Sequence, residues 1–304
     1  MAVNKVSRSK ARYIKSPLNY VGGKYRLLNQ LIPHFPEKIG TFYDLFSGGA
    51  NVGINVDASH YVFNDMNYHI NDLFRYLQEH PTMEVIDNIE ATIRQWGLSK
   101  TNQEAFIAFR EHYNEDPNPL DLYVLSSFSY NYQIRFNNDM KYNNPFGRNR
   151  SSFSTNMRNN LIRFSERLKS IDALFTDQYF EDVDLSILTT RDFVYIDPPY
   201  LITTGSYNDG ARGFKNWDMN SELSLLKKVE YLTNHGIPVA LSNVMRHKGK
   251  VNTLLEDFVD NPSYHTYRLD YNYDNSSHNS RLTGSMEVLV TNYCLTREGT
   301  AVVT

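Results

Sequence analysis

The stretch Thr41-Phe-Tyr-Asp-Leu-Phe-Ser-Gly-Gly-Ala50 decides the fold. Its first six residues favour a buried β-strand, and the two glycines that follow predict a tight turn. A helical pattern continues to about Ala58, and a second strand is expected at Tyr61 to Asn64. Because a strand, a crossover helix and a second strand form a βαβ unit, the sequence predicts an α/β fold with a parallel sheet and helices on both faces.

Further strands are expected late in the chain. Asp192 to Ile196 is a short apolar run typical of a strand that is buried on both faces. Similar runs follow at Ile237–Ser242 and Glu287–Cys294. The sheet is therefore built from both ends of the chain.

The middle of the chain has a different character. Tyr68 to about Tyr130 is mainly helical, with breaks at Pro81, Gly97 and residues 116–119. Residues 131–160 lose all periodicity, and a helical pattern returns at Leu161–Leu174. So long an irregular segment in a compact protein is more often functional than idle. We predict one domain from residues 1–74 and 175–304, interrupted by a mostly helical insert of residues 75–174.

Composition excludes several classes of protein. The chain has 304 residues with ordinary apolar and charged content, and its longest apolar runs have five to seven residues. About 20 are needed to span a bilayer, so no membrane partner is expected and we expect a cytoplasmic protein. The single cysteine, Cys294, excludes a disulfide framework and a cysteine-based zinc site. The nine histidines lack metal-ligand spacing, so no metal is expected.

Charge is unevenly distributed along the chain. Residues 1–30 hold seven Lys and Arg and no acid, a charge of +7, and residues 131–170 hold eight against two acids, a charge of +6. The net charge is −3, so the other residues must sum to −3 − 13 = −16. Two basic zones on an acidic body can follow a phosphate backbone. Two solvated surface patches would give the same pattern.

The tetrapeptide Asp197-Pro-Pro-Tyr200 directly follows a predicted strand. Ligands in open α/β sheets bind beyond the carboxyl ends of strands. The prolines fix the backbone and remove two donors, so carbonyl groups project as rigid acceptors. The Asp197 carboxylate and the Pro198 carbonyl could each accept one hydrogen of a planar amine, and Tyr200 could stack on its ring. An amine polarised in this way can attack an electrophilic methyl group. The alternative is a Pro-Pro turn with a helix-capping Asp.

Two glycine-containing segments suit a nucleoside ligand. The turn Ser47-Gly-Gly49 follows Asp44 and Phe46, and Asp65 ends the next predicted strand, 65 − 44 = 21 residues later. An acid at that place holds ribose hydroxyls in nucleoside-binding βαβ units. The segment Tyr20-Val-Gly-Gly-Lys24 lacks the Walker A pattern, which disfavours ATP hydrolysis, but offers a backbone nest and a cation suited to a carboxylate.

Together these motifs resemble the Dam-like, α class (D12 type) family of DNA adenine-N6 methyltransferases. Tyr20–Lys24 resembles the family's Trp-Ala-Gly-Gly-Lys motif, and Asp44–Gly53 its glycine-rich cofactor motif. Asp197–Tyr200 matches its Asp-Pro-Pro-Tyr motif. Residues 130–137 and 144–147 resemble its target-recognition hairpin, placed here at about 131–150. Ser242-Asn243 and Ser276–Glu287 resemble its later motifs.

The resemblance implies a Rossmann-like S-adenosylmethionine-dependent methyltransferase sheet with a helical target-recognition insert. Lys24 is expected near the methionine carboxylate of the cofactor and Asp65 on its ribose, while Phe180, Glu181 and Asp182 are expected to close over its adenine. The expected catalytic residues are Asp197, Pro198, Pro199 and Tyr200. The expected cofactor-binding residues are Tyr20, Gly22, Gly23, Lys24, Asp44, Phe46, Ser47, Gly48, Asp65, Phe180 and Asp197.

The resemblance also implies how DNA is read. Tyr130 is expected to fill the stack that a flipped adenine vacates, and Arg135 to pair with a guanine edge. The expected DNA-binding residues are Tyr130, Asn131, Gln133, Arg135, Asn137, Pro145 and Arg148. The family's common 5′-GATC site is one candidate target. Asn19 and Gln133 depart from the common pattern at positions that read the site, because a basic residue and Leu are usual there.

The implied function is a site-specific DNA adenine-N6 methyltransferase that converts S-adenosylmethionine to S-adenosylhomocysteine. It would serve restriction-modification or phage or host methylation. Expected partners are double-stranded DNA and a cognate restriction endonuclease, and the expected oligomeric state is monomer or weak dimer. A cytosine-C5 enzyme is excluded, because Cys294 lacks the setting of a thiolate nucleophile. The open alternatives are a non-catalytic DNA-binding module and a methyltransferase for RNA or a protein glutamine amide.

Overall fold

The computed structural model describes residues 13–20, 22–203, 217–270, 284–296 and 299–303. Three features singled out from the sequence lie partly outside these ranges. They are residues 1–12 of the first basic zone, residue 21 of the motif Tyr20–Lys24 and residues 276–283 of the stretch Ser276–Glu287. Within the described residues, none of the helices is both long and apolar enough to cross a membrane.

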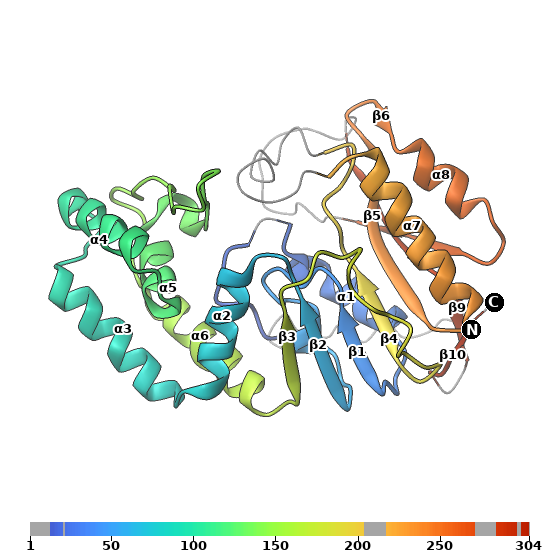
Figure 1. Ribbon diagram of the computed structural model, residues 1–304, viewed down its shortest axis with the longest axis horizontal. Coiled ribbons are helices and arrows are strands. Elements are labelled where there is room, and N and C mark those ends of the chain that lie inside the picture. Colours follow the sequence, from blue (N-terminus) through green and yellow to red (C-terminus); the bar gives the residue numbers. More distant parts are fainter. Residues whose placement is uncertain (1–12, 21, 204–216, 271–283, 297–298, 304) are drawn as a thin grey trace, which may run out of the picture.

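A mostly parallel sheet forms the centre of the fold, in the strand order β3-β2-β1-β4-β5-β8-β7 (Figure 1). The first five of these run parallel, and β8 pairs antiparallel with both β5 and β7. The short strand β6 (Lys250–Val251) pairs antiparallel with the end of β5, and a separate antiparallel pair joins β9 (Tyr293–Leu295) to β10 (Ala301–Val303). The strands of the main path are β1 (Thr41–Asp44), β2 (His60–Asn64), β3 (Ala173–Thr176), β4 (Phe193–Ile196), β5 (Val239–His247), β7 (His265–Leu269) and β8 (Met286–Thr291).

Helices cover both faces of this sheet, because successive side chains of a strand point to opposite sides. On β1, Phe42 packs into the apolar cluster that contains Leu28 of α1 (Leu28–Leu31). The next residue, Tyr43, packs into the cluster that contains Leu225 of α7 (Met219–Asn234), which also receives α8 (Thr253–Val259). The predicted Rossmann-like α/β fold is therefore confirmed.

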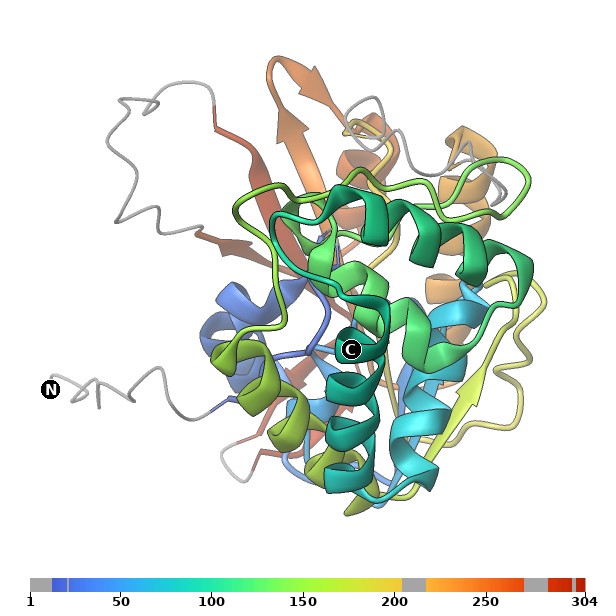
Figure 2. The same cartoon turned by 90° about the vertical axis from the view of Figure 1, so that its left-hand side faces the viewer.

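Five helices continue beyond the β3 edge of the sheet (Figures 1 and 2). The predicted breaks at Pro81 and Gly97 separate them, and Gly97 ends its helix in the left-handed region at φ 62°. At Asn118 the side chain caps the next helix by accepting a hydrogen bond from the Asp121 backbone. The helices are α2 (Tyr68–Glu79), α3 (Thr82–Trp96), α4 (Gln103–Glu115), α5 (Pro119–Phe128) and α6 (Thr155–Lys169).

Two helix predictions were wrong. The helix expected up to Ala58 is only a 3₁₀ turn, η3 (Gly53–Asn55), because Asn51 and Asn55 bond through their side chains to the backbone of residues 14 and 16. The helix expected at Leu161–Leu174 ends at Lys169, since residues 173–176 pair with β2 as strand β3.

Three further differences concern the late strands and helices. The strand expected at Glu287–Cys294 divides at Asn292, whose side chain accepts a hydrogen bond from the Val239 backbone at 2.8 Å. Strand β7 and helix α8 were not predicted. Strand β7 is the edge strand of the main path and pairs with β8 alone.

Candidate active site

Two predicted site residues meet where the order of the sheet reverses, between β1 and β4. Asp44 is the last residue of β1 and pairs in register with Tyr195 of β4. Asp197 follows β4 directly. Adjacent parallel strands with connections leading in opposite directions open a crevice at their carboxyl ends, which is where α/β proteins bind ligands. The candidate site therefore lies at this reversal.

Asp197 is held by a buried cation and a hydroxyl group. The Lys24 ammonium lies 2.7 Å from Asp197 Oδ2 and 3.0 Å from the Gly22 carbonyl. The Tyr200 hydroxyl lies 2.9 Å from Asp197 Oδ1 and also 2.9 Å from Oε1 of Glu287, on β8. Lys24 is 4% exposed and the Asp197 side chain 16%, so this cluster is nearly closed to water.

Burial and crowding of acids shift the ionisation of the cluster. Burial raises the pKa of Asp197 above its usual range, although Lys24 and Tyr200 oppose that shift. Burial also raises the pKa of Glu287, and Lys24 again opposes the change. The pKa of Asp44 lies well above its usual value, first because of burial and then because of the nearby Asp197 and Asp65. Perturbed acids gathered in one crevice are typical of a functional site.

The glycine turn and Asp65 are joined by a direct hydrogen bond. The Gly48 backbone N–H donates to Asp65 Oδ2 at 2.9 Å, and the Asn67 N–H donates to Oδ1 at 2.8 Å. Gly48 has φ +45°, and a Cβ atom there would lie 3.0 Å from the Tyr20 ring, so only glycine fits without strain. Each Asp65 oxygen keeps a lone pair, and the side chain is partly exposed.

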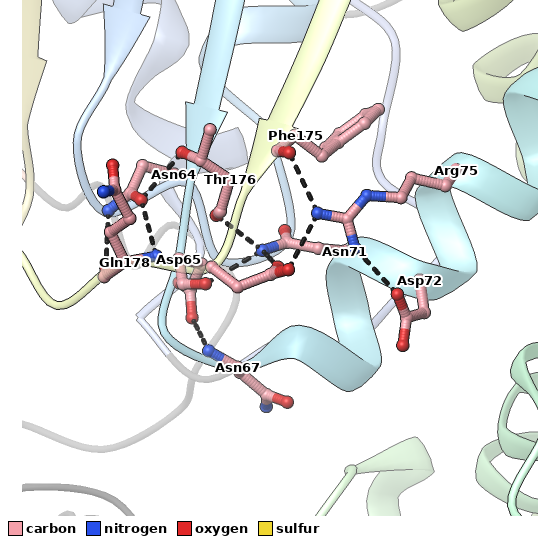
Figure 3. Close-up of polar contacts among 10 residues, drawn as sticks. Asn64, Asp65, Asn67, Asn71, Asp72, Arg75, Phe175, Thr176 and Gln178 are labelled. Carbon is pink, nitrogen blue, oxygen red and sulfur yellow. Dashed lines mark hydrogen bonds and ion pairs between the residues drawn. The ribbon is translucent and has the colours of Figure 1, made fainter. Parts of the chain in front are cut away.

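A polar network behind Asp65 sets its position (Figure 3). The Asn71 amide, on α2, donates to the backbone carbonyls of Asp65 at 2.8 Å and Thr176 at 2.9 Å, and to Asp177 Oδ1 at 2.6 Å. The Asn64 carbonyl oxygen accepts a hydrogen bond from the Thr176 hydroxyl at 2.8 Å. These contacts tie the ends of β2 and β3 to the start of α2, which carries the Asp65 loop.

We expect Asn71→Ala to weaken S-adenosylmethionine binding about ten-fold, because the lost hydrogen bonds leave the Asp65 loop unsupported. The measurement is titration calorimetry with the cofactor. The matched control is Asp72→Ala on the same helix, whose carboxylate contacts Arg75 at 2.7 Å and faces away from this loop in Figure 3. Equal affinities for the Asn71 variant and the wild type would contradict the role.

An aromatic group lines the side of the crevice next to the glycine turn. The rings of Phe46 and Phe180 are 5.5 Å apart, and the Trp217 ring lies 5.6 Å from Phe46 and 5.2 Å from Phe180. The indole of Trp217 donates to Glu222 Oε2 at 2.7 Å. Phe180 and Trp217 are buried, and the half-buried Phe46 is the ring of this group that a purine could contact.

The polar and aromatic residues at the carboxyl ends of β1 and β4 fit S-adenosylmethionine. Two buried oxygens, Asp44 Oδ1 and Ser47 Oγ, have no hydrogen-bond partner within the described residues, although buried polar atoms are normally paired. Asp65 suits hydroxyl groups and the half-buried Phe46 suits a purine face, so these residues fit parts of this cofactor, whereas Phe180 is buried behind Phe46.

The predicted DNA-binding residues lie on a separate irregular hairpin. Antiparallel bridges join Ser129 to Phe146 and Phe136 to Tyr142. At its surface, Tyr130 is 44% exposed, and the Arg150 guanidinium lies 5.3 Å above its ring. The predicted residues Pro145 and Arg148 are exposed, whereas Asn131, Gln133, Arg135 and Asn137 are exposed or half-buried.

A pocket of ≈ 380 Å³ lies where the N-terminal segment meets this hairpin. The Asn19 amide donates to the Asn131 carbonyl at 2.7 Å and joins the two segments. Asn19 and Gln133, the two positions that depart from the common family pattern, both line this pocket. Its lining residues are Asn19, Asn131, Tyr132, Gln133, Arg150 and Ser151.

The structure thus gathers Tyr20, Gly48 and Asp65 in one group and Lys24 with Asp197 and Tyr200 in another at the same sheet edge. Trp217 and Arg150 were not predicted as site residues, and Glu287 was singled out only as the end of the stretch Ser276–Glu287. The available signals were an acid at the head of an apolar strand for Glu287 and the second basic zone for Arg150. For Trp217 the sequence offers no such signal.

Comparison with known proteins gives the family. The model of the D12 class N6 adenine-specific DNA methyltransferases matches residues 20–274. This chain belongs to that family. It is 63% identical to the modification methylase StsI of Streptococcus sanguinis, over 95% of this chain and 44% of that protein.

Two other relatives show how far the similarity extends. The type II methyltransferase M.FokI of Planomicrobium okeanokoites is 51% identical over 92% of this chain and 43% of its own length. The DNA adenine methylase of Escherichia coli is 29% identical over 74% of this chain and 79% of its own length. This chain therefore spans less than half the length of StsI and M.FokI.

Proposed function

We propose that this chain is a site-specific DNA adenine-N6 methyltransferase that uses S-adenosylmethionine. The observation that carries the proposal is the position of Asp197-Pro-Pro-Tyr200 at the carboxyl end of β4, beside the Gly48 turn at the end of β1. Family membership supports the reaction, and the separate hairpin supports a nucleic-acid substrate. The insert of residues 75–174 is proposed as the target-recognition unit.

S-adenosylmethionine supplies an electrophilic methyl group on its sulfonium when bound. Asp65 would hold the ribose hydroxyls, Phe46 would contact the purine, and Lys24 would attract the carboxylate. Pro198 and Pro199 keep the backbone rigid after β4, which keeps the Asp197 carboxylate in one place. A substrate amine that donates to Asp197 is positioned and polarised, so catalysis comes from orientation rather than from a covalent intermediate.

The DNA side of the proposal rests on the hairpin. An adenine inside a duplex cannot reach a buried carboxylate, so the base must be everted. Tyr130 is exposed and aromatic and could occupy the vacated stack, while Arg148 and Arg150 are exposed cations that suit the phosphate backbone.

The deciding experiment is transfer of tritiated methyl from the cofactor to mixed-sequence duplex DNA. The expected product is N6-methyladenine, identified after digestion to nucleosides. Label in cytosine, in RNA or in protein, with none in adenine, would contradict the proposal. Sequencing of methylated DNA from cells that express the chain would identify the target, and 5′-GATC is one candidate.

Arg135 is expected to read a base. Its Nε donates to Asn143 Oδ1 at 3.0 Å, and within the described residues its terminal nitrogens have no hydrogen-bond partner. We expect Arg135→Ala to lose about 1–3 kcal/mol of discrimination at one base pair, because a bidentate guanine contact is lost. The measurement is the single-turnover rate on duplexes that carry each substitution in the target.

Arg148→Ala is the matched control, since its exposed side chain contacts Gln103 and is proposed to meet phosphate. That variant should weaken binding to all duplexes equally and reduce the salt dependence. If Arg135→Ala behaved in the same way as Arg148→Ala, the base-reading role would be wrong.

The biological setting is proposed from the relatives. StsI and M.FokI bear the names of a modification methylase and a type II methyltransferase, so we propose a role in restriction-modification with a cognate endonuclease that acts on the same site. Protection of DNA from that endonuclease by prior methylation is the test.

A further inference from the structure

The Tyr200 hydroxyl contacts two carboxyl groups but carries only one hydrogen. Its oxygen lies 2.9 Å from Asp197 Oδ1 and 2.9 Å from Glu287 Oε1. A phenol can donate one hydrogen bond and must accept in any other. If both acids were ionised, one of these short contacts would set two lone pairs against each other. One of the two carboxyl groups must therefore carry a proton that it donates to Tyr200.

The nearest cation identifies which acid stays ionised. Lys24 Nζ lies 2.7 Å from Asp197 Oδ2 but 3.5 Å from Glu287 Oε1. The short ion pair stabilises the charge on Asp197 in a site that is nearly closed to water. The Lys24 cation therefore stabilises an ionised Glu287 less than it stabilises an ionised Asp197.

Burial and the neighbouring Asp197 charge disfavour ionisation of Glu287. Its side chain is buried near the start of β8. Burial raises the pKa of Glu287, and the Asp197 charge raises it further while Lys24 lowers it. A neutral Glu287 removes one unit of uncompensated charge from this cluster.

The surroundings of Glu287 contain no other described cation. The groups that face it are Lys24, Asp197 and Tyr200, with Tyr195 of β4 also close enough to feel its charge. Its partners in the sheet are Val244 on β5 and Leu269 on β7, which are uncharged.

We propose that Glu287 is a positioning residue that acts in its neutral, protonated form. It donates a hydrogen bond to the Tyr200 hydroxyl, which donates its single hydrogen to Asp197. These two hydrogen bonds fix the Asp197 carboxylate as an ionised acceptor for the substrate amine and hold the Tyr200 ring in place. The inference rests on the proposed methyltransferase function and adds a residue to the same site.

Two substitutions test whether Glu287 is protonated. In Glu287→Gln the amide can donate to Tyr200 as a protonated acid does, whereas Glu287→Leu removes the donor. We expect the single-turnover rate of the Gln variant to stay within about three-fold of wild type, and that of the Leu variant to fall about ten-fold or more. Cofactor and DNA affinities should change by less than about three-fold in both, since the effect is on the reacting amine. Glu256→Gln, an acid paired with Arg246 on the far part of β5, is the control.

An infrared difference spectrum supplies a readout that is independent of rate. A protonated carboxyl group has a carbonyl stretch that a carboxylate lacks, so wild type minus Glu287→Gln should contain that band. The same spectrum keeps the test decisive if the Leu variant does not fold. A missing band, or a Gln variant as slow as the Leu variant, would overturn the proposal by showing that Glu287 acts as a charged group. Absence of methyl transfer by the wild type would instead refute the proposed function.

Discussion

Replacing Asp197 with Ala is expected to reduce the single-turnover rate of methyl transfer about a thousand-fold or more. Asp197 is the carboxylate at the switch point of the sheet, and both of its oxygens are held by Lys24 and Tyr200. Without Asp197 the substrate amine has no anionic hydrogen-bond acceptor, so the amine is neither oriented nor polarised. The loss should appear in the rate of the chemical step rather than in binding.

DNA affinity is the readout that separates this role from a general structural one. The predicted DNA-binding residues lie on the hairpin rather than at the switch point, so the dissociation constant should change by no more than about three-fold. Asp57→Ala is the control, because Asp57 is an exposed acid. A rate for Asp197→Ala within ten-fold of wild type would refute the catalytic role. Cooperative thermal unfolding of the variant would show that it is folded.

The second large effect is expected for Lys24→Met, on stability. This substitution leaves Asp197 and Glu287 buried without the cation that lies between them. Removing one partner of a buried ion pair costs about 3–5 kcal/mol of unfolding free energy, because the remaining charge is not compensated. Cofactor binding should also weaken, since the cation proposed for the carboxylate is lost.

The loss of unfolding free energy in Lys24→Met should depend on pH. The native pKa values of Asp197 and Glu287 are already raised with Lys24 in place, and they should rise further without it. Between the ordinary and the raised pKa values the native state binds more protons than the unfolded state, so stability falls as pH rises through that range. Lys24→Met should therefore be less destabilising at about pH 5 than at about pH 8.

Urea unfolding at those two pH values measures this difference. The control is Lys38→Met, which removes an exposed lysine and should have little effect at either pH. A loss for Lys24→Met that is independent of pH, or greater in acid, would show that the two carboxyl groups do not carry the effect.

Helices and strands with strong local signals were predictable from the chain. Pro81, Gly97 and Asn118 end or begin helices for reasons that lie within a few residues of each of them. The errors arose where distant contacts overrode a local pattern. Residues 173–176 form a strand because β2 offers an edge, and residues 53–55 stay a short turn because Asn51 and Asn55 bond to another segment.

The sequence by itself determined which chemical groups stand at the ends of the parallel strands. Asp44, Asp65 and Asp197 each follow a run of strand-forming residues, and that spacing puts them at one edge of any parallel sheet. The Gly48 turn was also predicted locally, since glycine adopts a positive φ without strain.

Only the tertiary structure decided that Lys24, Tyr200 and Glu287 share one buried cluster. These residues come from an N-terminal 3₁₀ turn, the segment after β4 and strand β8. Periodicity reports how a segment relates to the core, but it carries no information on which remote strand becomes its neighbour. The order of the strands brings two acids and one cation within hydrogen-bonding reach, and that proximity controls how the site is charged.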